Sequence, residues 1–321
     1  FLFKIIKNKI KTVIKDIFIH DIWNIGLIEK PIQMVLEKDF KLKIHWFPKP
    51  KKDRFYADPF GIRLKNKNYI LFEEFSFKNN RGIISFYQQI SNNYTGPQTS
   101  ISMPFHLSYP FLINHEGKTF CIPESYEANK IIIYKALDFP SKWSKGETLI
   151  NSIAATDPTI YRYKGKWWLF CSKFSDLPII NLYIFYSDEL NGPWIGHPLN
   201  PVKSDVISSR PAGTPFIYNG KLIRPAQDCS KTYGSRIVLN EVRKLTETEF
   251  EEKVIKVIET ERYEKYNKGI HTLSSIGTST LIDGRRYGFR RDLFKIKLLD
   301  HKKATNRFLK NLIKTLFRKN Q

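Results

Sequence analysis

The tetrapeptide Ala57-Asp58-Pro59-Phe60, followed after a turn by Tyr69-Ile-Leu-Phe-Glu-Glu74, sets the pattern for most of this chain. A polar residue and a proline open an apolar run, and an aromatic run then returns to a polar end. Three later segments repeat this order: Ser108-Tyr109-Pro110-Phe111 to Glu124, Thr156-Asp157-Pro158-Thr159 to Cys171, and Ser209-Arg210-Pro211-Ala212 to Ala226. The four prolines are 51, 48 and 53 residues apart. Self-similarity at this period predicts a repeat architecture.

Each repeat has room for about four antiparallel strands, which is the size of a propeller blade. Further apolar stretches lie between the copies: Gly82–Tyr87, Ile131–Tyr134, Leu182–Tyr186 and Ile237–Leu239. Gly117, Gly165 and Gly220 stand where a hairpin turn needs a positive φ.

A fifth, less regular unit begins near His271 and continues to Phe289. The apolar segment Trp23–Ile28 precedes the first repeat, and we expect it to complete the last blade, because an open sheet edge invites aggregation. We therefore predict an all-β fold, a five-bladed β-propeller over residues 21–292 with short amphipathic helical tails at residues 1–20 and 293–321. A β-sandwich with coincidental spacing is the structural alternative.

The composition of the 321 residues, with 41% hydrophobic and 14% aromatic residues, excludes a disordered chain. No run of 18 apolar residues and no signal-peptide pattern occurs, so neither a membrane span nor export is predicted. The first residue is Phe1 and not Met, which suggests a further enzymatic domain or partner upstream. Cys121, Cys171 and Cys229 lack CxxC spacing, so neither a disulfide framework nor a zinc site is predicted, and a reducing compartment is expected. Cys121 and Cys171 lie in aromatic, strand-like runs and are predicted to be buried thiols.

The net charge of +22 is concentrated at the two ends of the chain. Residues 1–20 carry +4 and residues 285–321 carry +11. In both tails, lysines or arginines lie opposite an apolar face at helical spacing, as Arg307 and Lys310 do relative to Phe308 and Leu312. This pattern is typical of a helix at an anionic membrane surface, and equally of a helix packed on the main domain. Nucleic acid is not predicted as a partner, because the basic residues are not interleaved with aromatic ones on the folded body.

Equivalent positions of every blade surround one central channel. The residues that open the five units are therefore predicted to meet at one mouth: Asp58, Tyr109, Asp157, Arg210 and His271. Residues at the ends of the second strands are predicted beside them: Glu124, Gln227 and Asp228. We predict that Asp58, Glu124 and Asp157 are catalytic, because glycosidic bond chemistry uses one protonated and one ionised carboxyl group.

The other candidates are predicted to bind substrate. Tyr109 and Tyr126 are expected to stack on sugar faces. Charged residues rarely line such a mouth without a partner, so a group of basic residues suggests a phosphate or sugar carboxylate ligand: Arg210, Arg224, Arg236 and His271. The structural alternative for the Asp-Pro pairs is capping of backbone N–H groups. No metal or cofactor is predicted, and P-loop, GxGxxG, HExxH and GxSxG strings are absent.

The Asp-Pro blade starts and the blade count resemble the furanosidase-like propellers of arabinanases, xylosidases, invertases and levansucrases. A closer resemblance, from about Trp23 to Phe289, is to the N-terminal propeller of plant glucosamine inositolphosphorylceramide transferases and its bacterial relatives. The strings that carry it are Phe55-Tyr-Ala-Asp-Pro-Phe60, Ile122-Pro-Glu-Ser125, Asp157-Pro-Thr159 with Trp167-Trp168, Ser209-Arg-Pro-Ala-Gly213, Arg224-Pro-Ala-Gln-Asp228 and His271-Thr272.

The two resemblances imply different roles. The glycosidases use an Asp, a Glu and a supporting Asp, and their first-blade Asp matches Asp58, but Tyr109 stands where they carry an acid at the start of the second blade. In the transferases, glycosyl transfer is assigned to a separate domain.

We expect a carbohydrate-active propeller in bacterial surface polysaccharide or glycolipid biosynthesis, at the cytoplasmic face of the membrane. Its activity is expected to be glycosyl transfer that involves an anionic or phosphate-linked sugar. The expected partners are a glycan, a sugar nucleotide or a lipid-linked sugar. A glycoside hydrolase of furanosides or acidic sugars and a non-catalytic glycan- or glycolipid-binding module are the alternatives.

Overall fold

β-Strands account for nearly all regular structure in residues 19–91 and 93–289, which are the residues that the computed structural model describes. Two short 3-10 helices, η1 (Ile32–Leu36) and η2 (Tyr126–Ala128), are the helical elements found there. In these same residues no helix has the length and apolar character that a membrane span requires. The chain divides into two compact units, residues 23–286 and residues 1–22 with 287–321.

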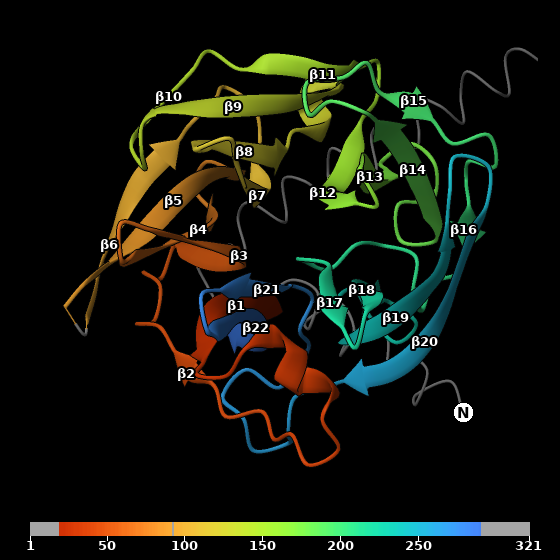
Figure 1. Ribbon diagram of the computed structural model, residues 1–321. Helices are drawn as coiled ribbons and strands as arrows, with labels where there is room; N and C mark the ends of the chain where they lie inside the picture. The colour runs from red at the N-terminus through yellow and green to blue at the C-terminus, as the bar shows by residue number, and fades with distance from the viewer. Residues whose placement is uncertain (1–18, 92, 290–321) are drawn as a thin grey trace, which may run out of the picture. The chain divides into compact units, whose positions relative to one another are not determined.

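The strands of the larger unit form five antiparallel sheets arranged in a ring, as Figure 1 shows. Blade 1 contains β3 (Arg54–Leu64), β4 (Lys67–Ser76), β5 (Arg81–Ile90) and β6 (Asn93–Ile101). Blade 2 contains β7 (Ser108–His115), β8 (Lys118–Glu124), β9 (Lys130–Asp138), β10 (Lys142–Trp143) and β11 (Glu147–Asn151). Blade 3 contains β12 (Ala155–Tyr163), β13 (Lys166–Lys173), β14 (Asn181–Ser187), β15 (Ile195–Gly196) and β16 (Lys203–Ser204). Blade 4 contains β17 (Phe216–Tyr218), β18 (Lys221–Asp228), β19 (Arg236–Leu245) and β20 (Phe250–Ile258).

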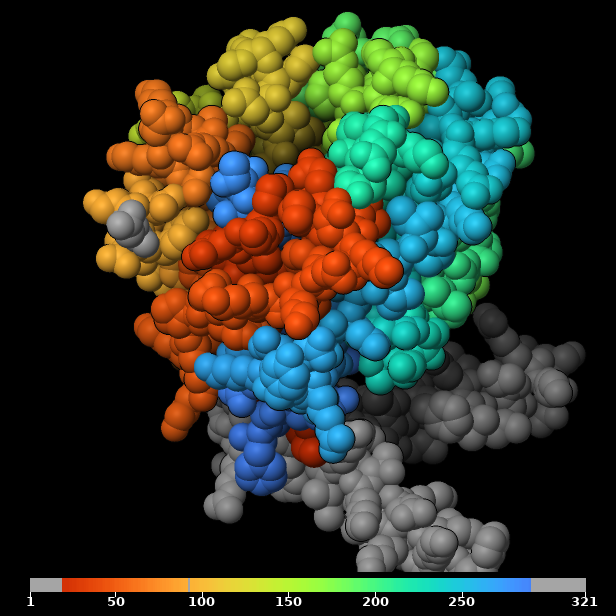
Figure 2. Space-filling model, turned by 60° about the horizontal axis from the view of Figure 1, so that its bottom comes forward, coloured from red at the N-terminus to blue at the C-terminus, as the bar shows by residue number. Residues whose placement is uncertain are grey.

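The last blade combines strands from both ends of the described chain. Its order is β2-β1-β22-β21, with β21 (Leu273–Ile276) innermost, then β22 (Ser279–Phe289), β1 (Ile19–Ile28) and β2 (His45–Trp46). The prediction that Trp23–Ile28 completes the last blade is therefore confirmed, and so is the five-bladed all-β propeller. Figure 2 shows how the segment after β1, in red and orange, lies beside the loop near residue 260, in light blue. Trp46 Nε1 donates to Glu264 Oε2 across this contact at 3.1 Å.

The first hairpin of blades 2, 3 and 4 has a two-residue turn with positive φ at both positions. The glycines of these turns have φ values of +71°, +83° and +73°: Gly117, Gly165 and Gly220. Each follows a residue with φ near +50°, which is the type I′ geometry that matches the twist of the strands. The turn glycines predicted from sequence are confirmed.

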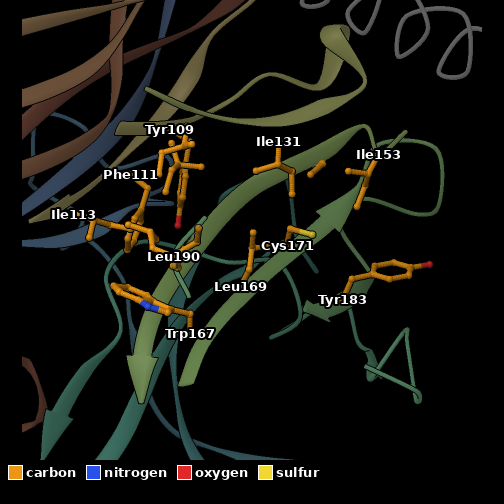
Figure 3. Packing of buried hydrophobic residues seen from close by; sticks show 14 of the residues in the cluster. Tyr109, Phe111, Ile113, Ile131, Ile153, Trp167, Leu169, Cys171, Tyr183 and Leu190 are labelled. Atoms are coloured by element: carbon orange, nitrogen blue, oxygen red, sulfur yellow. The ribbon is translucent and has the colours of Figure 1, made fainter. Parts of the chain in front are cut away.

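The core consists of five clusters of buried apolar side chains, each shared by neighbouring blades. Figure 3 shows the cluster between blades 2 and 3, where Phe111 and Ile131 face Trp167 and Leu169. All three cysteines are free and buried, which confirms the predicted burial of Cys121 and Cys171. Because each blade packs mainly on its two neighbours, we expect closure of the ring to stabilise the fold.

The predicted helical tails have no support in the described residues. Ile19 and His20, which we assigned to the first tail, are the first residues of β1. The remainder of that tail and the predicted helix at 293–321 lie outside the described residues.

Candidate functional site

The first strands of blades 1, 2 and 3 contain the same irregularity before their proline. Asp58, Tyr109 and Asp157 have φ values of +52°, +46° and +50°, and each directly precedes a proline. The pairing of β3 with β4, β7 with β8, and β12 with β13 shifts register at these positions, so each residue lies in a β-bulge. A bulge redirects a side chain away from the sheet, and positive φ costs a non-glycine residue energy. The repeat thereby turns three side chains towards the axis of the ring.

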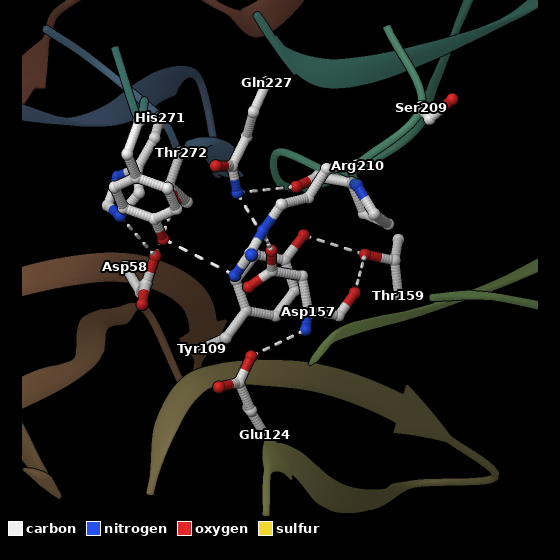
Figure 4. A network of polar contacts seen from close by, with 12 residues as sticks. Asp58, Tyr109, Glu124, Asp157, Thr159, Ser209, Arg210, Gln227, His271 and Thr272 are labelled. Atoms are coloured by element: carbon white, nitrogen blue, oxygen red, sulfur yellow. Dashed lines mark hydrogen bonds and ion pairs between the residues drawn. The ribbon is translucent and has the colours of Figure 1, made fainter. Parts of the chain in front are cut away.

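Asp157 lies at the centre of the polar network that Figure 4 shows. Arg210 Nε donates to Asp157 Oδ2 at 2.5 Å, and Gln227 Nε2 donates to the same oxygen at 2.9 Å. Glu124 Oε2 accepts the backbone N–H of Asp157 at 2.8 Å. Burial, and then the charge of Asp157, raise the pKa of Glu124 to about 8, although Arg210 opposes this. Near neutral pH, Glu124 therefore carries a proton, while the ion pair with Arg210 stabilises the Asp157 carboxylate.

His271 lies between two carboxyl groups on the other side of the pocket. Its Nδ1 is 2.5 Å from Asp283 Oδ2, and its Nε2 is 3.6 Å from Asp58 Oδ1. Burial lowers the pKa of His271, but the charges of Asp283 and Asp58 outweigh burial, and the net pKa is raised. Burial raises the pKa of Asp58 to about 6, and the charge of His271 opposes that shift. This geometry favours an imidazolium that Asp283 orients towards Asp58.

Within the described part of the chain, Asp58, His271 and Asp283 also have the spacing of a metal site, since one ligand atom of each lies within 4.8 Å of the others. Asp283 already accepts the backbone N–H groups of Asp58, His271 and Thr272. The raised pKa of His271 means that a proton competes with a cation for its ring nitrogens. The contacts of these residues are therefore better explained by a histidine held between two carboxyl groups than by a metal site.

Glu73 belongs to the same site, and our sequence analysis missed it. It pairs with Ala57 as Glu124 pairs with Ser108, and both glutamates lie fourteen residues after their blade's proline, at 59 and 110. Extending the repeat offset from Glu124 to blade 1 identifies Glu73. Burial raises the pKa of Glu73 well above its ordinary value, and the charge of Asp58 adds to this shift. Glu73 Oε1 is 3.5 Å from His106 Nε2.

These side chains line one pocket with a volume of about 210 Å³. Its charged and acidic lining consists of Asp58, Glu73, Glu124, Asp157, Arg210 and His271. Four aromatic side chains also line it: Trp23, Phe55, Phe75 and Tyr233. The Trp23 ring stacks on His271 at 4.0 Å, and Arg210 lies 5.2 Å from the centre of the Tyr233 ring. The pocket thus combines flat apolar faces with buried acids.

Tyr109 and Gln227 lie in the network but not in the pocket lining. The Tyr109 hydroxyl is 2.8 Å from Thr159 Oγ1 and accepts the backbone N–H of Gly213 at 2.6 Å. The ring is fully buried, and it packs on Phe60. Tyr109 therefore joins blades 2, 3 and 4 below the pocket, and this burial does not fit the predicted stacking on a sugar.

Three further candidates lie away from the pocket. Arg224 is 1% exposed, pairs with Glu252, and donates to the backbone oxygens of Ser208 and Ser209. Arg236 pairs with the buried Asp228 at 2.5 Å. Neither arginine is available to a ligand in the pocket, so the predicted substrate contacts of Arg224, Arg236 and Asp228 do not fit the structure. The charges of these arginines, like that of Arg210, have carboxylate partners inside the protein.

Tyr126 lies outside the pocket, next to its rim. The centre of its ring is 5.9 Å from the ring of His106, which lines the pocket. Of the predicted site residues, the structure brings together Asp58, Glu124, Asp157, Arg210 and His271 in one lining, with Gln227 directly behind.

Comparison with known proteins identifies relatives by sequence. The family described as glucosamine inositolphosphorylceramide transferase 1, N-terminal, matches residues 48–278. The protein named glucosamine inositolphosphorylceramide transferase 1 from Oryza sativa subsp. japonica is 34% identical over 205 residues, which are 62% of this chain and 27% of that protein. Its namesake from Arabidopsis thaliana is 33% identical over 205 residues with the same coverage. The match thus spans about a quarter of the length of these relatives.

Solved structures with a similar fold are glycoside hydrolases. Zg3597, a family 117 glycoside hydrolase of Zobellia galactanivorans, has a TM-score of 0.52 and 14% identity, covering 75% of this chain and 76% of that one. The exo-β-1,3-galactanase 1,3Gal43A of Clostridium thermocellum has a TM-score of 0.51 and 12% identity, covering 65% and 53%. At these identities the likeness shows the fold alone.

Proposed function

The chain belongs to the family of the glucosamine inositolphosphorylceramide transferase 1 N-terminal domain, and from this we propose that its propeller binds one sugar residue in the central pocket during glycosyl transfer. The matched relatives are named as transferases, but the match covers 27% of their length. Transferase activity is therefore part of the proposal. These relatives are plant proteins, and a role in bacterial polysaccharide or glycolipid biosynthesis is likewise proposed.

The observation that carries this proposal is the contrast between two adjacent buried carboxyl groups. Glu124 has a pKa near 8 and contacts the backbone of Asp157, whose carboxylate pairs with Arg210. Glu124 donates its proton to the departing oxygen as the bond from the anomeric carbon breaks. Asp58, with a pKa of about 6, accepts the proton of the incoming hydroxyl as the new bond forms. Asp157 stabilises the positive charge at the anomeric carbon between these events.

The ion pairs of the arginines affect which charge the bound sugar is expected to carry. Our prediction of an anionic sugar depended on arginines without partners, and Arg210, Arg224 and Arg236 all have carboxylate partners. That support is therefore gone, and the acidic lining suits a neutral or amino sugar instead. A phosphate leaving group would meet Arg210 Nη1, which makes no hydrogen bond with other described residues.

Two alternatives have specific support. Hydrolysis is favoured by the fold, because the similar solved structures are glycoside hydrolases. A non-catalytic binding module is favoured by Tyr109, because a buried tyrosine stands at the blade start where Asp58 and Asp157 supply carboxylates. Binding of a sugar in the pocket is common to all three functions.

The test offers labelled sugar nucleotides with cell extract, and an array of defined glycans, to the purified chain and to Glu124→Gln. A transferase labels an acceptor, a hydrolase releases free sugar, and a module binds without turnover. Glu124→Gln should abolish turnover and preserve binding, since an amide keeps the shape but donates no acidic proton. Asp188→Asn, a change at an exposed carboxylate, is the matched control. A wild-type chain that neither binds nor converts any sugar would contradict the proposal.

We also propose that the basic tails attach the protein to an anionic membrane surface on the cytoplasmic side, near a lipid-linked acceptor. Residues 285–321 carry +11, and each basic residue near such a surface contributes about 1 kcal/mol. At low salt, the intact chain should sediment with anionic liposomes, whereas a chain that ends at Asp300 should stay in the supernatant. Equal sedimentation of both chains would contradict membrane attachment through this tail.

A further inference from the structure

A row of four rings leads from the pocket to the protein surface. Phe75 and His106 line the pocket, and their ring centres are 6.1 Å apart. The His106 ring is 5.9 Å from Tyr126, and Tyr126 stacks on Phe174 with centres 4.6 Å apart and planes 16° from parallel. The row therefore crosses from blade 1 through blade 2 to the loop after β13 in blade 3.

The outer end of the row is exposed and yet held in place. Phe174 is 55% exposed, although its backbone N–H donates to Ala154 O at 2.8 Å. Tyr126 begins η2, whose turn is closed by the Ala128 and Asn129 N–H groups at 3.0 and 2.9 Å. A large aromatic face that is anchored and open to solvent is ready to bind a ligand without further ordering.

Carboxyl groups lie beside Tyr126 and on the loop that carries Phe174. The Tyr126 hydroxyl is 3.4 Å from Glu127 Oε1, and Glu127 Oε2 accepts the backbone N–H of His106 at 2.8 Å. On the Phe174 loop, Asp176 accepts a hydrogen bond from the Tyr183 hydroxyl. A pyranose ring has an apolar C–H face and hydroxyls at its rim, so it matches an aromatic face with acceptors beside it. An alkyl chain has no donor to offer these oxygens.

The size of the pocket adds a second, independent argument. Sites for drug-sized ligands enclose roughly 300–1,000 Å³, and this pocket has about 210 Å³. It suits one sugar residue, so any residue attached to that sugar must lie outside, at the rim.

We propose that Tyr126 and Phe174 form an outer subsite that stacks on the second sugar ring of a glycan whose terminal sugar occupies the pocket. The inference rests on the proposed sugar-binding function and adds to it that the ligand is an oligosaccharide or a glycosylated acceptor. Phe174 provides the open ring face, and Tyr126 supports it from the side of the pocket.

The test is an array of mono-, di- and trisaccharides that includes glucosamine, galactose and their homo-oligomers, followed by calorimetric titration of the sugars that bind. Phe174→Ala should weaken oligosaccharide binding about tenfold and leave monosaccharide binding unchanged, because only the outer ring loses its stacking partner. Leu177→Ala is the matched control, since Leu177 is 57% exposed on the same loop but is not part of the ring row. This variant should bind both classes as the wild type does.

Several results would overturn the subsite. Equal wild-type affinity for monosaccharides and oligosaccharides would remove it and leave the pocket proposal intact. Equal losses in Phe174→Ala and Leu177→Ala would indicate a general apolar contact. Weaker adsorption of Phe174→Ala to phosphatidylcholine vesicles, with glycan binding unchanged, would make the loop a lipid contact instead. If the wild-type chain binds no sugar at all, the proposed function itself is contradicted, and this result is obtained before any variant is compared.

Discussion

At the residue scale, the pocket depends on buried charges that compensate one another. Asp157 and Arg210 are both buried, and their contact at 2.5 Å offsets a desolvation cost that neither charge could bear alone. Burial raises the pKa of both Glu73 and Glu124, and Glu124, with a pKa of about 8, avoids that cost by keeping its proton near neutral pH. Neighbouring acids in different protonation states are what acid–base chemistry requires.

The first prediction concerns the ion pair. Asp157→Asn should lower the free energy of unfolding by about 3–5 kcal/mol, because it leaves the Arg210 guanidinium buried without a counter-charge. The double variant Asp157→Asn with Arg210→Met should recover much of this loss, since it removes both charges. Urea denaturation of the single and double variants measures both effects. Loss of less than about 1 kcal/mol in Asp157→Asn would mean that Arg210 does not depend on this partner.

The second prediction follows from the raised pKa of Glu124, about 8 in the folded protein against an ordinary value of 4.5. Between these two pH values the unfolded chain loses the proton and the folded chain keeps it. The stability that this difference allows is therefore fully present below pH 4.5 and declines as the pH rises to about 8. In Glu124→Gln this decline should be absent.

Urea unfolding of the wild type and of Glu124→Gln, compared from about pH 5 to about pH 8, measures the effect. The variant should gain up to about 4 kcal/mol relative to the wild type across this range. Asp188→Asn serves as the control at an exposed carboxylate. Parallel pH profiles for all three proteins would show that Glu124 ionises normally.

At the scale of elements, the bulged strand starts are the feature that builds the site. The same bulge in β3, β7 and β12 presents an acid, a tyrosine and an acid, and each positive φ costs on the order of 1–3 kcal/mol. Blade 4 differs, because its inner segment is held by a parallel bridge between Gly213 and Leu273. Gly213 has a φ of +121°, and a Cβ there would lie 1.9 Å from Leu273 O.

The third prediction uses this close approach. Gly213→Ala should destabilise the protein by more than about 3 kcal/mol, because the new methyl group pushes blades 4 and 5 apart. Gly220→Ala is the matched control, with a φ of +73° but nothing within 4 Å of the added atom. It should cost only about 1 kcal/mol of conformational strain. Equal losses in chemical denaturation would show that the bridge to Leu273 does not limit this position.

At the scale of the whole molecule, we expect closure of the ring to be required for stability. β1 pairs with β22 in the last blade, and Trp23 on β1 also supplies the ring that stacks on His271. The N-terminal strand therefore completes both the fold and the pocket.

The fourth prediction removes this strand. A chain that starts at Glu29 should lose cooperative unfolding and self-associate, because β22 is left as an unpaired edge. A chain that starts at Ile19 keeps β1 and should behave as the full chain does. Size-exclusion chromatography and urea unfolding compare the two. Monomeric, cooperative behaviour of the shorter chain would show that four complete blades and an incomplete fifth are sufficient.

Much of this fold could be predicted from the sequence, because each repeat contains the same local pattern of proline, turn glycine and apolar residues. The blade-opening prolines, the turn glycines at 117, 165 and 220, and the apolar runs each depend on neighbours within a few residues. For the same reason Asp58, Tyr109, Asp157 and Arg210 could be assigned to one axis, since equivalent positions of a propeller converge. Glu73 was within reach of the same argument, since it shares its offset with Glu124.

Only the tertiary structure decided what those residues do. Tyr109 and Asp157 occupy equivalent bulges of blades 2 and 3, yet Tyr109 is buried between blades and Asp157 lines the pocket. The difference arises because their partners come from other blades: Thr159 and Gly213 bind Tyr109, and Arg210 binds Asp157. Arg224 looked like a ligand group until Glu252, 28 residues further on, proved to be its partner. Charge pairing and pKa depend on distances through space, and local sequence does not specify them. The sequence by itself therefore determined the ring and its axis, whereas the packing of one blade on the next decided which charges remain available for chemistry.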